Sequence, residues 1–125
     1  MTYTAEVIRL NDDIEEEVVL RINGVELTCF ASVCPYPIVE RATYEVALIP
    51  VVFDDYSVRE MSKDTHTSLV KVGNGFAYEL VGELAGGLLD IGCISLEDDV
   101  LLRDYGYLNG KIIAWMIDRI DVEFM

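Results

Sequence analysis

The chain has 125 residues, of which 52% are hydrophobic, and its 23 acidic side chains outnumber nine basic ones to give a net charge of −14. Nucleic acids and anionic membrane surfaces bind proteins through lysine and arginine, so this balance argues against both as partners. The length fits one domain over residues 1–125. The lack of a long apolar run or a signal-peptide pattern predicts a soluble, cytoplasmic protein.

Residues 3–10 have the pattern of a strand and lead into an acidic turn. Residues 11–17 carry five carboxylates in seven positions: Asp12, Asp13, Glu15, Glu16 and Glu17. Charges at a strand end guard against edge-to-edge pairing. They also form the candidate surface for a basic partner.

Asn23-Gly24 lies between two runs of β-forming residues and predicts a hairpin with a two-residue loop, because both positions accept positive φ. This loop sets Ile22 opposite Val25 and Leu20 opposite Leu27. Side-chain alternation then gathers one apolar face. Its members are Val18, Leu20, Ile22, Val25, Leu27, Cys29, Ala31 and Val33. A lone hairpin is marginal in water, so the rest of the chain must cover this face.

The middle of the chain predicts an irregular link, a strand and a long loop. The link is Cys34-Pro35-Tyr36-Pro37, where two prolines remove ladder donors. Residues 43–53 have a strand pattern in which Pro50 marks an edge, a bulge or a bend. Residues 54–66 are expected to form a loop, and their length makes them a candidate functional segment.

The last third predicts a second meander. Residues 68–72 and 76–85 are expected to pair across Gly73-Asn74-Gly75, with Val70 opposite Tyr78. The Gly86-Gly87 turn should then return a strand over 88–96 that sets Leu84 opposite Leu89 and Leu80 opposite Cys93. A capping-box-like pattern at Ser95 predicts a short helix over 97–105. Residues 111–124 are expected to form one strand, buried on both faces at its centre.

These elements amount to about eight strands and at most one short helix. Tight turns between short strands predict a mainly β protein, a compact antiparallel β-barrel or sandwich. A small barrel of the oligonucleotide/oligosaccharide-binding (OB) type is the favoured architecture, since closure would cover the hairpin's apolar face.

Metal chemistry is not favoured by the residue pattern. Cys29, Cys34, Cys93 and His66 contain the donor types of a zinc site. However, Cys29 and Cys93 fall on apolar faces, where free cysteine acts as a small hydrophobic residue. The acidic runs lack the spacing of a calcium loop. We therefore predict no metal site and no cofactor.

Catalytic chemistry is not indicated either. His66 lies in a polar stretch, which is the usual place of a surface histidine. The carboxylate pairs Asp54/Asp55 and Asp118/Asp121 could do acid–base work, but such pairs are expected by chance among 23 acids. No catalytic residue is predicted, and the balance favours a protein that is not an enzyme.

Three functions remain as hypotheses. The first is a non-enzymatic acidic module that binds a basic protein, as an inhibitor or immunity-type protein does; the plain alternative is that the charge serves solubility alone. The second is a small-ligand or sugar-binding barrel that uses the loop residues Asp54, Asp55 and Tyr56 with nearby aromatic rings. The candidate rings are Tyr36, Tyr44, Phe53, Tyr56, Tyr105 and Tyr107. The third is a metal-assisted enzyme with clustered carboxylates. A homo-oligomer formed through a strand edge is compatible with all three.

Overall fold

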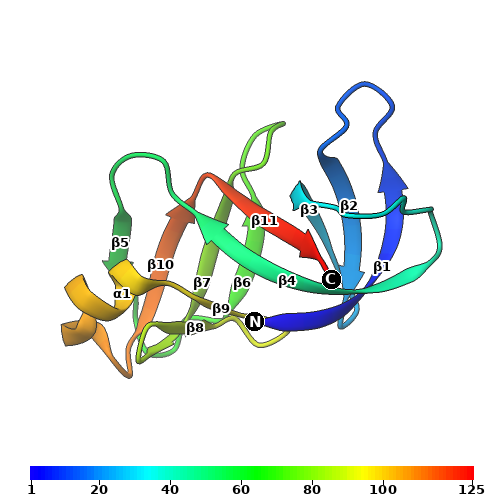
Figure 1. Ribbon diagram of the computed structural model, residues 1–125. Helices are drawn as coiled ribbons and strands as arrows, with labels where there is room; N and C mark the ends of the chain where they lie inside the picture. The colour runs from blue at the N-terminus through cyan, green and yellow to red at the C-terminus, as the bar shows by residue number, and fades with distance from the viewer.

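The computed structural model describes all 125 residues as eleven strands in two sheets with one short α-helix. Five strands close into a ring: β1 (Thr2–Leu10), β2 (Glu17–Ile22), β3 (Val25–Val33), β11 (Arg119–Phe124) and β4 (Thr43–Val51). The second sheet contains β5 (Ser57–Glu60), β6 (Ser68–Lys71), β7 (Tyr78–Ala85), β8 (Leu88–Asp90), β9 (Ser95–Glu97) and β10 (Ile112–Ile117). Figure 1 shows the ring on the right and the second sheet on the left.

The eleven strands confirm the mainly β prediction, although about eight were expected, and five of them form a ring-like sheet rather than a true barrel. All neighbouring strands in the ring are antiparallel except β3 and β11, which run parallel. The purely antiparallel prediction is therefore wrong at this one contact. The reason is that a closed ring with an odd number of strands cannot alternate in direction at every contact, so at least one neighbouring pair has to run parallel.

The hairpin at Asn23-Gly24 is confirmed in every predicted pair, from Ile22 with Val25 to Val18 with Cys29. Asn23 and Gly24 have φ angles of 50° and 82°, the left-handed values that this turn requires. The predicted face points into the ring, where most of it is fully buried. A core of 24 buried residues runs without a break from the ring into the second sheet.

The second sheet closes the ring at the end where Asn23 lies. The Asn23 side-chain amide donates to the Cys93 carbonyl at 2.8 Å, and the Tyr78 hydroxyl accepts from the Thr28 amide at 2.8 Å. The Tyr3 hydroxyl accepts from the Ser95 amide at 2.7 Å and donates to the Ser95 carbonyl at 3.1 Å. The lid that the hairpin needed is therefore the stretch around β9.

Residues 111–124 form two strands rather than the single predicted strand, because the chain passes from one sheet to the other at Asp118. The Asp118 amide donates to the Val51 carbonyl at 2.9 Å, and its carboxylate accepts from the Phe53 amide at 2.7 Å. Of the edge, bulge or bend expected at Pro50, the structure shows an edge on one side. β1 pairs with β4 only as far as Ala47, so no strand faces the nitrogen of Pro50, which has no hydrogen to donate.

Two further strand predictions need correction. The predicted loop over 54–66 contains β5, which pairs with β10. In the hairpin of β6 and β7, Val70 pairs with Glu79 and not with Tyr78, a shift of one residue. The cause is Phe76, which stays in a longer loop and packs edge to face on Phe30 of the ring at 5.6 Å between ring centroids.

The turn at Gly86-Gly87 and the pair Leu84/Leu89 are confirmed, but the returning strand is not continuous. It ends at Asp90, and residues 91–94 turn the chain back as β9, so Leu80 does not pair with Cys93. A Cβ atom on Gly82 would lie 2.3 Å from the Asp90 carbonyl oxygen, which shows how closely the turning chain crosses β7.

The helix α1 (Asp99–Asp104) is shorter than predicted and is capped by Asp98, not Ser95. The Asp98 carboxylate accepts from the amides of Val100 and Leu101, both at 3.1 Å. Ser95 belongs to β9 instead. A 3₁₀ turn, η1 (Gly106–Leu108), follows α1. Neither segment is long or apolar enough to pass through a membrane.

Candidate functional site

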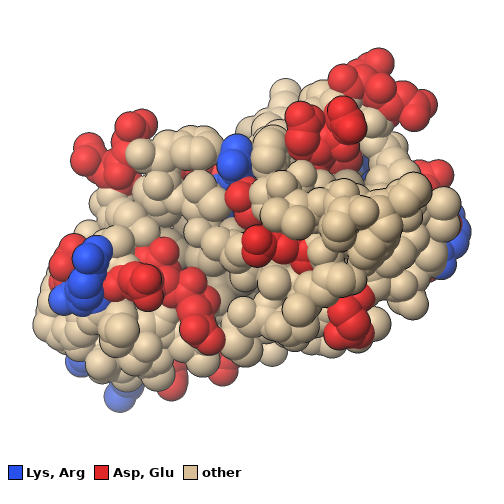
Figure 2. All heavy atoms as spheres, in the orientation of Figure 1, with Lys and Arg blue, Asp and Glu red and all other residues tan.

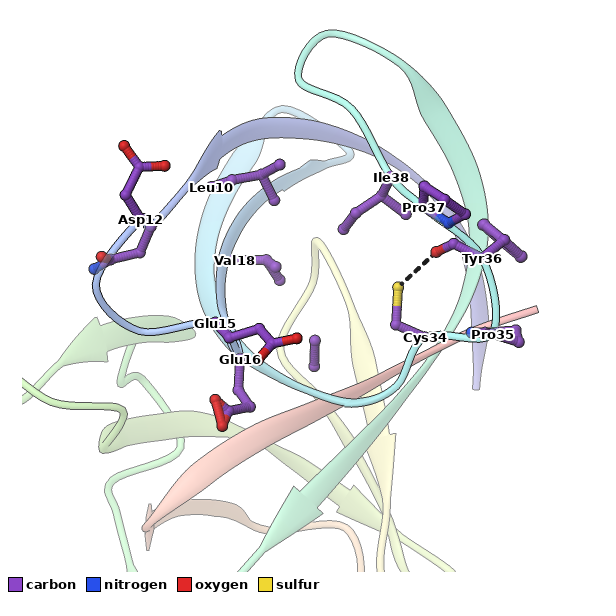
Figure 3. A pocket seen from close by; sticks show the side chains of 12 residues that line it. Leu10, Asp12, Glu15, Glu16, Val18, Cys34, Pro35, Tyr36, Pro37 and Ile38 are labelled. Carbon is purple, nitrogen blue, oxygen red and sulfur yellow. Dashed lines mark hydrogen bonds between the residues drawn. The ribbon is translucent and has the colours of Figure 1, made fainter.

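A hollow of about 960 Å³ lies at the end of the ring opposite the Asn23-Gly24 turn. We call this open end the mouth, and the space within it the mouth hollow. The loop between β1 and β2 and the loop between β3 and β4 flank it on two sides (Figure 3). The second sheet closes the other end, so this is the end at which the ring interior is accessible.

The floor of the mouth hollow is apolar and comes from β1, β2, β3 and the β3–β4 loop. It consists of Leu10, Val18, Ala31 and Ile38. Val18 is buried, whereas the other three are half-buried. Leu10, Val18 and Ile38 all point toward the centre of the ring in Figure 3. The alternation that fills the core thus continues to the mouth, where Leu10 and Ala31 are only half-buried.

The rim of the mouth hollow is acidic, with Asp12, Glu15 and Glu16 among its residues. Figure 3 shows the Glu15 carboxylate directed into the hollow and those of Asp12 and Glu16 directed away from it. Acidic side chains gather over the β1–β2 loop in Figure 2. None of the five ion pairs in the structure involves a residue of this loop, so its carboxylates are uncompensated.

The remaining predicted acids, Asp13 and Glu17, line a second space of about 300 Å³ on the other side of the same loop, together with Arg9, the one basic residue in its lining. We call it the side hollow. It shares Leu10, Asn11 and Asp12 with the mouth hollow. All five predicted acidic residues are therefore brought to the mouth, three on its rim and two in the adjoining side hollow.

The β1–β2 loop is held in shape by Asn11. Its side-chain oxygen accepts from the amides of Asp13 and Ile14 at 2.8 and 3.1 Å, and its amide nitrogen donates to Glu17 at 2.6 Å. The Leu10 amide donates to the Glu40 carboxylate at 3.1 Å, which ties this loop to the one opposite. These bonds fix the rim before any ligand arrives, which lowers the entropic cost of binding.

The β3–β4 loop is anchored through Tyr36. Its hydroxyl donates to the Met125 carbonyl at 2.7 Å, and its ring stacks on Tyr44 with 5.8 Å between centroids. The Cys34 thiol donates to the Tyr36 carbonyl at 3.2 Å inside the hollow. The irregular link predicted from its prolines is thus an ordered wall of the site.

The second predicted group, Asp54, Asp55 and Tyr56, does not converge on a site. Asp54 and Asp55 are exposed at the turn before β5. Tyr56 stacks on Trp115 at 5.9 Å, and its hydroxyl donates to both Asp98 oxygens at 3.0 and 2.9 Å. Burial, aided by the Asp98 carboxylate, raises the pKa of Tyr56. This ring therefore serves packing and a helix cap.

A third hollow, of about 480 Å³, includes part of the 54–66 segment. Most of its lining is charged or polar: Glu60, Ser62, Lys63, Glu83 and Lys111. A sugar site needs an aromatic or apolar surface as well as polar groups. The wall of this hollow holds no aromatic ring, so the 54–66 segment gains no support as a sugar site.

The cysteines are all free, and neither they nor the carboxylate pairs form a metal-binding group. Cys29 is buried and burial raises its pKa, while Cys34 is exposed and Cys93 half-buried. Asp121 pairs with Arg119 at 2.6 Å. No three His, Cys, Asp or Glu side chains are grouped so that they could hold a metal ion.

Sequence reasoning found the acidic rim but missed the apolar floor. Leu10 and Ile38 carry no motif, and only the closure of the ring brings them together. The hairpin register did predict part of the floor. Side chains alternate along a strand, so the register that buries Val18 on β2 also places Ala31 on the same face of β3.

The chain belongs to the family described as Uncharacterised conserved protein UCP019853, which matches residues 1–125. No curated protein and no solved structure matches the chain. The family description assigns no activity, so the function has to be argued from the mouth and its chemistry.

Proposed function

We propose that this protein binds a basic protein partner at the mouth of its ring. The observation that carries the proposal is the pairing of an apolar floor with an uncompensated acidic rim in one concave place. Acidic residues alone are usually a solvated surface. An apolar floor beneath them adds a surface whose burial would stabilise a complex, at roughly 25 cal/mol per Å² removed from water.

The charge of the whole chain supports the same partner. A net charge of −14 on 125 residues produces a negative field around the molecule. Such a field steers cationic partners toward the protein and repels anionic ones, which raises the association rate more than the affinity. The apolar floor and the inward Glu15 carboxylate would supply the short-range part of the affinity.

A small amphipathic cation is the second candidate ligand. The volume of the mouth hollow, about 960 Å³, falls in the range of small-molecule sites. Its ordered walls and mixed lining are also typical of such sites. This candidate uses the same floor and rim, so it moves the sequence hypothesis of a small-ligand barrel from the 54–66 segment to the mouth.

The experiment is a calorimetric titration of the protein with oligolysine and with a small basic carrier protein at about 150 mM salt. The test variant is Glu15→Gln/Glu16→Gln. The matched control is Asp54→Asn/Asp55→Asn, which makes the same charge change at two adjacent exposed acids far from the mouth. We expect the mouth variant to weaken binding about tenfold or more, and the control about twofold, since 1.4 kcal/mol is tenfold in affinity.

Equal losses in the two variants would show that binding depends on net charge alone, and the proposal would then be wrong. No salt-sensitive binding to either probe would also reject it. Retained binding of a small amine with no binding of oligolysine or the carrier protein would favour the second candidate instead.

A further inference from the structure

We infer that the mouth hollow recognises a primary alkylammonium group, carried by a lysine side chain on an extended segment of the partner. The inference rests on the proposed function and specifies which basic group enters. It depends on three features: the shape of the mouth, the number of carboxylates that point inward, and the aromatic ring of Tyr36, which is already packed on another ring.

The shape favours a single projecting side chain over a flat surface. Ordered loops stand on two sides of the hollow, and the half-buried floor residues Leu10 and Ile38 lie between them beneath a rim of exposed carboxylates. The flat face of a folded protein meets the rim and does not reach such a floor. A long side chain on an extended segment does reach it.

The lining of the mouth hollow suits both the methylene chain and the ammonium group of a lysine. A lysine side chain is a flexible run of methylene groups that ends in a compact point charge. The methylenes would pack against Leu10 and Ile38, which point into the hollow. The ammonium would face Glu15, the rim carboxylate that is directed inward. Burying the stem while the charge stays near the rim is the usual arrangement for this side chain.

The lining matches arginine less well. Guanidinium groups are preferred where several acceptors or an open aromatic face meet their planar fork. At the mouth, the carboxylates of Asp12 and Glu16 point away. The aromatic ring in the lining, Tyr36, is stacked on Tyr44 and held by its hydroxyl bond to Met125.

The side hollow indicates that the segment continues past the mouth. Three carboxylates, Asp12, Asp13 and Glu17, line this space against one cation, Arg9, and the space adjoins the mouth hollow along Leu10, Asn11 and Asp12. An extended segment with one lysine in the mouth hollow can place a second basic residue there. The preferred ligand is therefore a segment with more than one lysine, and a single amine is a weaker ligand of the same chemistry.

The test compares two peptides of equal charge, each with four repeats, one of Gly-Lys and one of Gly-Arg, by calorimetry at about 150 mM salt. We expect the lysine peptide to bind about tenfold more tightly, a difference of 1.4 kcal/mol. Glu15→Gln should remove most of this preference, and the control Asp54→Asn should leave it unchanged. Pentylamine should compete with the lysine peptide at higher concentration.

The outcomes separate this inference from the proposed function. Equal binding of both peptides that is lost in the mouth variant would overturn the lysine preference and leave the basic-partner proposal standing. A preference that survives in Glu15→Gln would overturn the role of that carboxylate. Binding of pentylamine without binding of either peptide would assign the site to a small amine. It would reject the claim that the ammonium group belongs to a lysine of a partner protein.

Discussion

The two ends of the ring have the same strands but opposite character. At the closed end, polar groups from the second sheet pair with the ring through Asn23, Thr28 and Tyr3, and the apolar residues beneath are buried. At the mouth, half-buried apolar residues face an open hollow and the rim carboxylates have no cationic partner. The contacts within the chain therefore stabilise the closed end more than the mouth.

This difference is why we propose the mouth as the binding surface: its apolar floor is partly exposed and its rim carboxylates have no cationic partner within the chain. Covering Leu10 and Ile38 with a loop, or placing a lysine beside Glu15, would stabilise the chain, because buried apolar area and opposite charges both do so. The rim loops are nevertheless ordered by specific bonds, so the mouth is not simply loose. An ordered site that gives up stability is typical of binding surfaces.

The comparison predicts its largest effect for Ile22→Ala and a small one for Leu10→Ala. Ile22 is 1% exposed near the closed end, and truncating such a residue leaves a cavity that costs about 3 kcal/mol. Leu10 is half-buried at the mouth, so its truncation should cost roughly 1 kcal/mol. Urea unfolding of both variants measures the difference. Similar losses in the two would mean that the ends do not differ as described.

The next effect concerns the crossing at Gly82, beneath the segment that closes the ring. An alanine Cβ there would meet the Asp90 carbonyl oxygen at 2.3 Å, a backbone atom that cannot move aside easily. We expect Gly82→Ala to cost about 2 kcal/mol through overpacking. Gly75→Ala is the control, since nothing lies within 4 Å of its added Cβ. Equal thermal midpoints for the two variants would show that β7 and the turn after β8 adjust freely.

The hairpin shows how far sequence alone could predict this fold. Its register was correct in every pair, because an Asn-Gly turn specifies a register through local backbone angles. The divisions at Asp90 and Asp118 could not be predicted in this way. They depend on the close approach to Gly82 and on the bonds of Asp118 to Val51 and Phe53, and these arise only when distant strands meet.

The candidate site divides in the same manner. The acidic rim could be predicted because five carboxylates in seven residues are adjacent in the chain. The floor could not, since Leu10 meets Val18 only when β1 pairs with β2, and meets Ile38 only when the β3–β4 loop folds back beside the end of β1. Tyr56 is a loop residue, as predicted, but its ring packs on Trp115 instead of facing a ligand site, and its polar neighbours in sequence give no sign of this contact. A charged segment can therefore be recognised from adjacent residues in the sequence, whereas a concave surface built from distant residues cannot.

The closed end should also be sensitive to alkaline pH. Burial raises the pKa of the Tyr78 hydroxyl, which accepts from the Thr28 amide. The unfolded tyrosine releases its proton near pH 10 while the folded one still holds it. The free energy of unfolding is therefore fully present below about pH 10 and falls as pH rises through the folded pKa. Burial also raises the pKa of Cys29. Because an unfolded cysteine loses its proton near pH 8.5, the free energy of unfolding begins to decrease from about that pH.

Urea unfolding at pH 8 and pH 11 measures this loss, with Tyr78→Phe as the test variant. At pH 8 the variant should lose about 1 kcal/mol, because the Thr28 amide loses its acceptor. From pH 8 to pH 11, the free energy of unfolding should decrease less in Tyr78→Phe than in the natural chain. The exposed Tyr107 gives the control, Tyr107→Phe. An unchanged pH dependence in Tyr78→Phe would assign the alkaline loss to other groups.

The smallest predicted effect has the opposite sign and lies at the mouth. Glu15 and Glu16 are adjacent exposed acids with no cationic partner, so Glu15→Gln/Glu16→Gln removes repulsion and leaves no charge unpaired. We expect the free energy of unfolding to rise by about 0.3 kcal/mol at low salt, and the gain to shrink as salt screens the rim. Glu26→Gln is the contrast, because Glu26 pairs with Arg21 at 3.0 Å and its loss should lower stability by a similar amount. A mouth variant that is less stable than the natural chain would mean that these carboxylates hold the loop together. One that is slightly more stable, and yet binds cations poorly, would show that they are kept for a ligand.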